Sequence, residues 1–363
     1  MKILITGNMG YVGPAVVSQL RATFPEATLI GYDMAYFASY LTNATVFPES
    51  KLDMQIFGDV RTISASVLRG VDAIVHLAAI SNDPMGNQYE DVTLDVNYRS
   101  SVRIAELAKK EGVGAFVFAS SCSMYGAAED EAKTEASKLN PLTAYARSKV
   151  FTEQGLNPLA DQDFTVTCLR FATACGMSSR LRLDLVLNDF VAGAVASGEI
   201  NILSDGSPWR PLIHVRDMAR AIEWAVGREA VNGGEFLALN TGSNLWNFQV
   251  LELAEAVSAC IPGTRVSVNK NAAPDKRSYR VDFSLFNSLA PDYQPLYTLT
   301  QAIEELYLGL SEMEFKDPEF RSSHLMRLKA LSHLLNTKQV NGDLQWIPSN
   351  RINYNDKLQT EVI

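Results

Sequence analysis

The sequence contains no long uninterrupted run of apolar residues, although a membrane-spanning helix needs about 20 of them in succession. We therefore expect no transmembrane segment. The chain opens at once on the strand-like MKILITG, which favours the absence of a signal peptide. Cysteine is scarce, and the four that occur are scattered: Cys122, Cys168, Cys175 and Cys260. This spacing predicts reduced thiols in a cytoplasmic protein rather than a disulfide framework.

Runs of basic residues are also missing. The chain has 32 lysines and arginines against 41 aspartates and glutamates, which gives a formal net charge of -9. This balance argues against nucleic acid or an anionic membrane as a partner. The four histidines form no cluster, so we expect no metal bound by the protein.

Short apolar segments alternate with helix-like stretches through the first half of the chain. The candidate strands are KILIT, TLIGYD, QIFGDV, AIVHLAA, AFVFASS and FTVTCLRF. Helix-like stretches at residues 14–24 and 98–111 separate some of them. Apolar strands that alternate with helices are typical of a parallel sheet buried on both faces. The sequence therefore predicts an α/β fold with a Rossmann-type, doubly wound parallel sheet.

This rhythm loosens after about residue 171. We expect a dinucleotide-binding domain at residues 1–170, to which residues 212–242 return. The remainder, residues 171–211 and 243–316, then forms a smaller, discontinuous C-terminal substrate domain. Residues 317–363 form a helical tail to which the sequence assigns no role. The tail's leucines fall on one stripe, so we expect it to dock on the rest of the protein: Leu325, Leu328, Leu331, Leu334 and Leu335.

The first strand runs into TGNMGYVG, where Gly7, Gly10 and Gly13 have the spacing G-x-x-G-x-x-G. Such a turn brings backbone N–H groups and a helix N-terminus close to a pyrophosphate. The second strand ends in Asp33, twenty residues past Gly13, where a carboxylate can accept both hydroxyls of an adenosine ribose. An acidic group there repels a 2′-phosphate, so NAD is favoured over NADP. Asp59 and Val60, after the third strand, are placed to meet the adenine, or Asp59 is only a helix cap.

The segment PLTAYARSKVFTE puts Tyr145 and Lys149 four residues apart, on one face of a helix capped by Thr143. A chance pair on a solvated helix is the alternative. A tyrosine is a poor base at neutral pH because its ordinary pKa is about 10. A neighbouring ammonium and a positive nicotinamide ring would lower that pKa and make the phenol a usable base.

In order along the chain, TGNMGYVG, Asp59-Val60, HLAA, Asn97, SSCSMYG, YARSK, LRFATACG and RPLIHVRDMARA resemble the motifs of the extended short-chain dehydrogenase/reductase family. This family includes NAD-dependent nucleotide-sugar epimerases, dehydratases and ketoreductases. The resemblance extends from residue 1 to about residue 309 and excludes the tail. It implies that Tyr145, Lys149 and Ser121 surround the reacting carbon of a sugar, and that the protein is a homodimer.

The resemblance also implies a set of NAD-binding residues, and most of them lie after the strands of the first domain. They are Gly7, Met9, Gly10, Tyr11, Val12, Gly13, Asp33, Asp59, Val60, Leu77, Ala78, Ala79, Asn97, Ser120, Tyr145, Lys149 and Phe171. Substrate contacts are expected from Ser123, Thr173, Asn188, Arg210 and Arg277. Guanidinium groups bind diphosphates well, although the second arginine position could slide to Lys276 or Arg280. Thr173 stands where the family has an asparagine, and Met177 where it has a proline, so no sugar is implied.

The loop after Ser121 separates the reaction types of this family. Its dehydratases carry an Asp-Glu pair there, whereas this chain has Cys122 and Ser123, a pattern most similar to UDP-galactose 4-epimerases. Cys122 is expected to pack away from the site, on the other face of the extended segment. We therefore expect an NAD-dependent nucleotide-sugar epimerase acting at carbon 4 through a transient 4-keto intermediate. A nucleotide-sugar 4-ketoreductase or dehydrogenase is the alternative, and a non-catalytic dinucleotide-binding regulator is a third.

Overall fold

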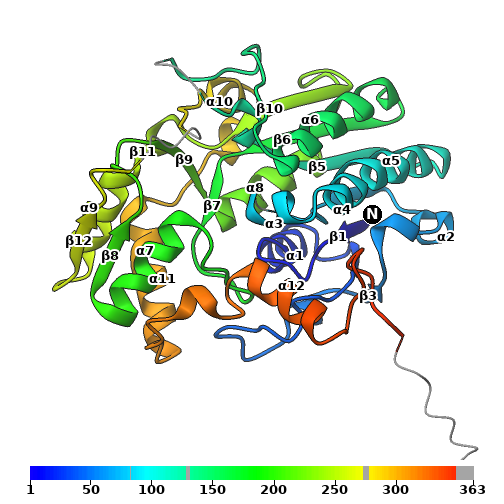
Figure 1. Ribbon diagram of the computed structural model, residues 1–363. Helices are drawn as coiled ribbons and strands as arrows, with labels where there is room; N and C mark the ends of the chain where they lie inside the picture. Colours follow the sequence, from blue (N-terminus) through cyan, green and yellow to red (C-terminus); the bar gives the residue numbers. More distant parts are fainter. Residues whose placement is uncertain (82, 128–130, 273–277, 349–363) are drawn as a thin grey trace, which may run out of the picture.

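The computed structural model describes residues 1–81, 83–127, 131–272 and 278–348 (Figure 1). Its main feature is a seven-stranded sheet of order β10-β6-β5-β4-β1-β2-β3, in which every neighbouring pair is parallel. The strands are β1 (Lys2–Thr6), β2 (Thr28–Asp33), β3 (Met54–Phe57), β4 (Ala73–His76), β5 (Ala115–Ser121), β6 (Thr165–Phe171) and β10 (Phe236–Thr241). The chain therefore winds outward from β1 in both directions, which confirms the predicted Rossmann-type fold.

Both faces of this sheet are covered, and β1 shows how. Ile3 and Ile5 pack into a core shared with α1 and α8, whereas Leu4 packs into the core of the opposite face together with Ile104 of α5. This alternation follows from the two-residue period of a strand, and both sets are apolar because helices cover both faces. The helices around the sheet are α1 (Gly13–Thr23), α2 (Ala65–Leu68), α3 (Asp83–Gln88), α4 (Glu90–Leu94), α5 (Ser100–Lys110), α6 (Ala144–Leu156), α8 (Val215–Val226) and α10 (Ser284–Leu289).

A second group of elements forms a smaller unit beside the sheet, at the left of Figure 1. It contains two small sheets, of order β11-β9-β7 and β12-β8. Its strands are β7 (Thr173–Cys175), β8 (Glu199–Ile202), β9 (Trp209–His214), β11 (Asn247–Gln249) and β12 (Arg265–Val268). Its helices α7 (Val186–Ser197), α9 (Val250–Cys260) and α11 (Leu299–Glu312) share one apolar core.

The expected elements agree with the structure best where apolar periodicity is strong. The strands KILIT, TLIGYD and AFVFASS coincide with β1, β2 and β5. The helix expected at 98–111 forms as α5, Ser100–Lys110, and a π-helical turn, Asp95–Arg99, precedes it. Within the described part of the tail, residues 317–348, the helical elements are a 3-10 turn (Phe320–Ser322) and α12 (Arg327–Asn336). In the part of the chain that the structure describes, no helix is long and apolar enough to cross a membrane.

Candidate active site

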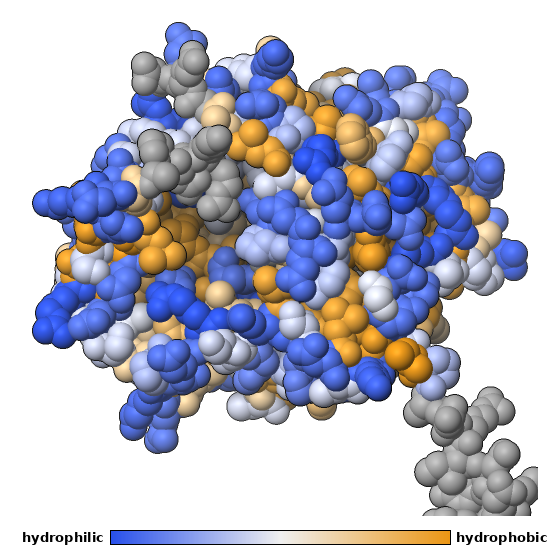
Figure 2. Space-filling view, viewed as in Figure 1, coloured by the Kyte–Doolittle hydropathy of each residue, from blue (hydrophilic) through white to orange (hydrophobic). Residues whose placement is uncertain are grey.

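A cavity of about 960 Å³ opens at the carboxyl ends of the sheet strands. It is lined by residues that follow β1, β2, β4, β5 and β6, and its far side is formed by the smaller unit and by the tail. β1 and β4 are neighbours from which the chain winds in opposite directions, and ligands of such sheets bind beyond this switch point. Figure 2 shows a hollow with apolar, orange surface in the corresponding part of the molecule.

The glycine loop after β1 has room for backbone only. Gly7 has a φ of +74°, and a Cβ added to it would lie 2.5 Å from the backbone nitrogen of Ala78. A Cβ on Gly13 would lie 1.9 Å from the carbonyl oxygen of Asn8. Gly7, Gly10, Tyr11 and Val12 line the cavity, whereas Met9 and Gly13 support the turn from outside. The loop thus presents backbone at the start of α1 to the cavity, and this fits the diphosphate of a dinucleotide.

Asp33 ends β2 and lines the same cavity. One of its carboxylate oxygens accepts the N–H of Met9 at 3.0 Å, and the other accepts the N–H of Ala35 at 2.7 Å. Burial raises the pKa of this carboxyl, while the two backbone hydrogen bonds lower it. A carboxylate has about four acceptor positions, so Asp33 can still accept ribose hydroxyls. Its position therefore fits the adenosine half of NAD.

Asp59 and Val60 have different positions relative to the cavity. The Asp59 carboxylate accepts the N–H of Arg61 at 2.9 Å, which caps a short 3-10 turn, and it also pairs with the Arg61 guanidinium at 2.7 Å. Val60 lines the cavity, and Asp59 does not. The capping alternative weighed for Asp59 is therefore present, and its carboxylate is engaged by Arg61.

Tyr145 and Lys149 lie in the first turns of α6, and Thr143 caps this helix by accepting the N–H of Ala146 at 3.1 Å. The Lys149 Nζ lies 5.5 Å from the centre of the Tyr145 ring. Ser121 ends β5 and hydrogen-bonds the Tyr145 hydroxyl. All three side chains line the cavity, together with Ser120 and Ser123. The structure thus brings the three expected catalytic groups together.

The electrostatics of this trio differ from the sequence-based expectation. In the protein alone, burial raises the pKa of Tyr145 to about 12, and the groups that lower it most are Ser121 and Arg182 rather than Lys149. Burial also lowers the pKa of Lys149 to about 7. Both shifts have one cause, because a buried site disfavours the charged form of either group. In the protein alone, burial therefore opposes ionisation of the Tyr145 phenol.

Beyond Ser121 the chain makes a 3-10 turn, Cys122–Tyr125. Cys122 points into the core, where its thiol donates to the carbonyl of Arg170 at 3.0 Å, and burial raises the pKa of this thiol. Ser123 faces the cavity. The interpretation of Cys122 as a packing residue is confirmed.

Several other expected binding residues also line the cavity: Leu77, Ala78, Ala79, Phe171, Thr173 and Arg210. Two others do not line it. Asn97 is buried and bonds both backbone groups of Ile80, whereas Asn188 bonds Gly176, Arg182 and Tyr11. Both are placed to hold the loops of the site rather than to face a ligand. Arg277 and Lys276 lie outside the described residues, and Arg280 stacks on Trp209 at 5.2 Å.

The structure adds polar residues that the sequence analysis missed. Arg182 is buried at the cavity wall, where it pairs with Asp184 at 2.6 Å and donates to Ser81 at 3.0 Å. Asp83, at the start of α3, accepts the Thr143 hydroxyl at 2.6 Å and raises the pKa of nearby Tyr145. Arg327 reaches the cavity from the tail. Only the run RLRLD, with alternating charged residues, hinted at any of them. Among the described residues, no group of three or more His, Cys, Asp or Glu side chains could hold a metal ion.

Comparison with known proteins identifies a protein family and related sequences. The model of the NAD-dependent epimerase/dehydratase family matches residues 3–240. An uncharacterised UDP-glucose epimerase of Bacillus subtilis (strain 168), YtcB, is 27% identical over 267 residues, which cover 71% of this chain and 82% of that protein.

Solved structures share the fold at lower identity. A UDP-glucose 4-epimerase from Stenotrophomonas maltophila, with bound NAD and formylated UDP-arabinopyranose, has a TM-score of 0.73 at 22% identity. The match covers 86% of this chain and 99% of that one. The NAD-dependent NDP-hexosamine 5,6-dehydratase TunA also has a TM-score of 0.73, at 21% identity, with 88% and 99% of the two chains covered. One architecture thus serves enzymes with different reactions.

Proposed function

The chain belongs to the NAD-dependent epimerase/dehydratase family, and from this premise we propose that it is a nucleotide-sugar epimerase that inverts carbon 4. NAD is its coenzyme. In this proposal Ser121, Tyr145 and Lys149 act on the sugar, and the residues that line the cavity from Gly7 to Val60 hold the coenzyme. Arg210 and Thr173 are assigned to the substrate, because they line the cavity from β9 and β7 of the smaller unit.

One observation carries the choice of reaction. The turn that follows Ser121 presents Ser123 to the cavity and turns Cys122 into the core, so no carboxylate follows the serine. Loss of water from a sugar needs an acid and a base beside the carbons that change, whereas epimerisation at carbon 4 needs one group that removes and returns one proton. The hydroxyl groups of Ser121, Ser123 and Tyr145, which line the cavity, suit epimerisation. Asp83 is a carboxylate whose charge raises the pKa of Tyr145, and it accepts a hydrogen bond from the Thr143 hydroxyl.

The roles of the side chains follow from their positions. The Tyr145 oxygen takes the proton of the 4-hydroxyl and later gives it back, while the Ser121 hydroxyl orients the same sugar oxygen. Lys149 donates to the carbonyl of Ala119, so its amine is fixed beside the phenol. When bound, NAD⁺ supplies the hydride acceptor and a positive ring whose charge favours the phenolate. Burial excludes water from the 4-keto sugar until its other face is presented.

The test is turnover in D₂O with UDP-glucose, UDP-galactose, UDP-glucuronic acid and UDP-N-acetylglucosamine. We expect interconversion of 4-epimers with no net absorbance of NADH and no deuterium on carbon, because the hydride returns to the carbon that it left. With added NAD⁺, release of one NADH per sugar nucleotide consumed would identify a dehydrogenase, or a ketoreductase running in reverse. A product that has lost water would identify a dehydratase, and deuterium on carbon would show that a carbon-bound proton exchanges with solvent. Any of these outcomes would refute the proposal.

A further inference from the structure

Residues 320–347, here called the C-terminal segment, run across the coenzyme end of the cavity. α12 and the residues after it bury Leu331, Leu334, Val340 and Leu344 against residues that follow β4, namely Ile80 and Met85. An isolated bridge, Val340 to Trp346, folds the end of the segment back on itself. The expected docking of the leucine stripe is thus confirmed, and Leu325 docks separately, in the core of the smaller unit.

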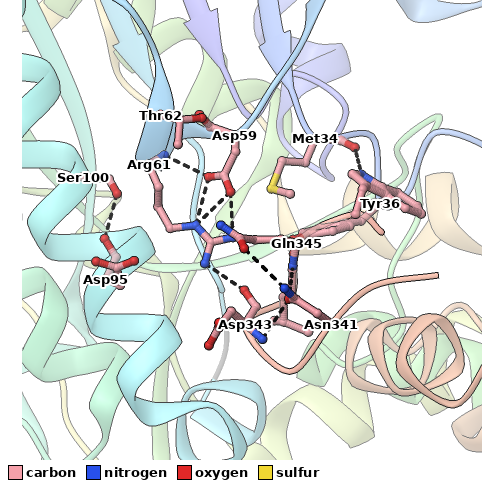
Figure 3. A network of polar contacts seen from close by, with 12 residues as sticks. Met34, Tyr36, Asp59, Arg61, Thr62, Asp95, Ser100, Asn341, Asp343 and Gln345 are labelled. Carbon is pink, nitrogen blue, oxygen red and sulfur yellow. Dashed lines mark hydrogen bonds and ion pairs between the residues drawn. The ribbon is translucent and has the colours of Figure 1, made fainter. Parts of the chain in front are cut away.

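Polar contacts fasten this segment to the loops that follow β2 and β3, as Figure 3 shows around Arg61. The Arg61 Nη1 donates to the carbonyl of Asp343 at 2.8 Å, and the Trp346 indole N–H donates to the carbonyl of Met34 at 2.6 Å. The Tyr36 hydroxyl donates to the carbonyl of Leu344. The first of these loops begins directly after Asp33 and the second contains Val60, and both residues are expected to meet the adenosine of NAD. The segment therefore forms a wall at the adenosine end.

Arg327, the first residue of α12, is a charged side chain of the C-terminal segment that faces the cavity. It is 2% exposed, it lines the cavity, and its guanidinium stacks on Phe37 at 4.2 Å from the ring centre. Its Nη2 donates to the carbonyl of Arg180 at 2.7 Å. Its Nη1 is buried and finds no hydrogen-bond acceptor among the residues that the structure describes. A buried, unpaired donor on a charged group costs several kcal/mol at most sites, so such a donor usually has a partner when the protein works.

The charged groups that act on Arg327 are two arginines, Arg182 and Arg180, and one carboxylate, Asp184. Arg180 pairs with Glu49 at 2.7 Å, and Arg182 pairs with Asp184 at 2.6 Å, so both neighbouring guanidinium groups have carboxylate partners. Burial and the charge of Arg182 lower the pKa of Arg327 to about 9. The site thus combines a cavity, a third arginine and a buried N–H group that has no acceptor among the described residues.

We propose that Arg327 binds the diphosphate of the bound dinucleotide, from the side opposite the glycine loop. Two neighbours place it at the coenzyme rather than at the sugar. Phe37, on which it stacks, lies four residues after Asp33, and Arg327 lines the same cavity as Gly7 and Tyr11 of the glycine loop. The substrate also carries a diphosphate, but the arginine assigned to that group is Arg210, on β9. A planar guanidinium donates well to phosphate oxygens. The inference rests on NAD binding and not on the epimerase proposal.

The test compares Arg327→Gln and Arg327→Lys with Lys329→Gln, an exposed position of the same helix. Calorimetry on coenzyme-stripped protein would measure the affinities for NAD⁺, ADP and adenosine. We expect Arg327→Gln to weaken NAD⁺ and ADP about ten- to a hundredfold and adenosine less than about twofold, because a charge-assisted hydrogen bond is lost. Arg327→Lys should recover part of the affinity, and Lys329→Gln should resemble the wild type.

Three results would overturn the proposal. The first is unchanged affinity for NAD⁺ and ADP. The second is an equal loss for adenosine, which would mean that Arg327 only supports the wall. The third is a loss confined to UDP-glucose, measured with NAD⁺ bound, which would assign Arg327 to the substrate. If Arg327→Gln does not fold, a crystal structure of the wild-type complex with NAD⁺ decides, since Nη1 must then lie within hydrogen-bond distance of a diphosphate oxygen.

Discussion

The Nζ of Lys149 lies 2.6 Å from the carbonyl oxygen of Ala119 and donates a hydrogen bond to it. Ala119 lies in β5 and Lys149 in α6, so this bond fixes the amine between the sheet and the helix, 4.6 Å from the centre of the Phe118 ring. An amine in such a place is largely removed from water. Its burial explains why its pKa falls to about 7.

This shift makes stability depend on pH. Below pH 7 the folded, coenzyme-stripped protein must bury an ammonium, and this cost falls as the pH rises from about 7 towards the ordinary lysine value of 10.5. We expect the free energy of unfolding of the wild type to rise relative to that of Lys149→Met by about 1.4 kcal/mol per pH unit in this range. Urea unfolding at several pH values measures it. Lys110→Met, at an exposed position, should show a constant difference, and a flat Lys149 difference would contradict the lowered pKa.

Tyr145→Phe tests the proposed base. The phenol oxygen is the atom that would carry the proton, and the ring that packs in the cavity is kept. We expect turnover to fall roughly a hundred- to ten-thousandfold, with NAD content after purification unchanged. Tyr307→Phe, on the exposed side of α11, is the matched control and should keep full activity. Activity of Tyr145→Phe within a few fold of the wild type would exclude the phenol as the base.

The variant Gly7→Ala tests whether position 7 needs glycine only for its positive φ or also because there is no space for a Cβ. Gly7 and Gly70 both have positive φ, at +74° and +69°, but an added Cβ meets Ala78 backbone at 2.5 Å only in the first case, and nothing within 4 Å in the second. Both variants should lose about 1 kcal/mol through backbone strain, whereas Gly7→Ala should lose about 1–3 kcal/mol more through overpacking. It should also bind NAD⁺ more weakly. Thermal unfolding and NAD⁺ titration measure both effects. Equal behaviour of the two variants would show that the glycine loop has more room than the structure gives it.

Leu334→Ala probes the C-terminal segment. Leu334 is 5% exposed in the cluster with Ile80 and Met85, so its truncation should cost about 2–5 kcal/mol. If the segment is a wall of the coenzyme site, NAD⁺ should also dissociate faster, because the wall opens more often. Stopped-flow displacement of NAD⁺ by excess ADP-ribose measures the rate. Leu308→Ala, at a 58% exposed position of α11, should change neither quantity. An unchanged dissociation rate in a destabilised Leu334→Ala protein would separate the segment from coenzyme retention.

The sequence was most informative where local signals and function coincide. Apolar strands, the glycine spacing and the Tyr145–Lys149 pair all lie on elements whose form follows from neighbouring residues, so their positions could be predicted. Asn188 was expected at the substrate, but its side chain instead holds Gly176 and Tyr11, since loop contacts depend on distant parts of the chain. The tail's stripe predicted that it docks and could not predict where. Arg182 and Arg327 were missed for the same reason, because only the folded chain brings them to the cavity.

Residues from near both ends of the chain, Gly7 and Leu344, line the same cavity. A ribosome makes the glycine loop among the first residues and the opposite wall hundreds of residues later. The last strand of the Rossmann sheet ends at residue 241, so the sheet can form before the opposite wall has been made. If the C-terminal segment holds the coenzyme as proposed, we expect a chain cut short before α12 to fold its sheet and to keep NAD poorly.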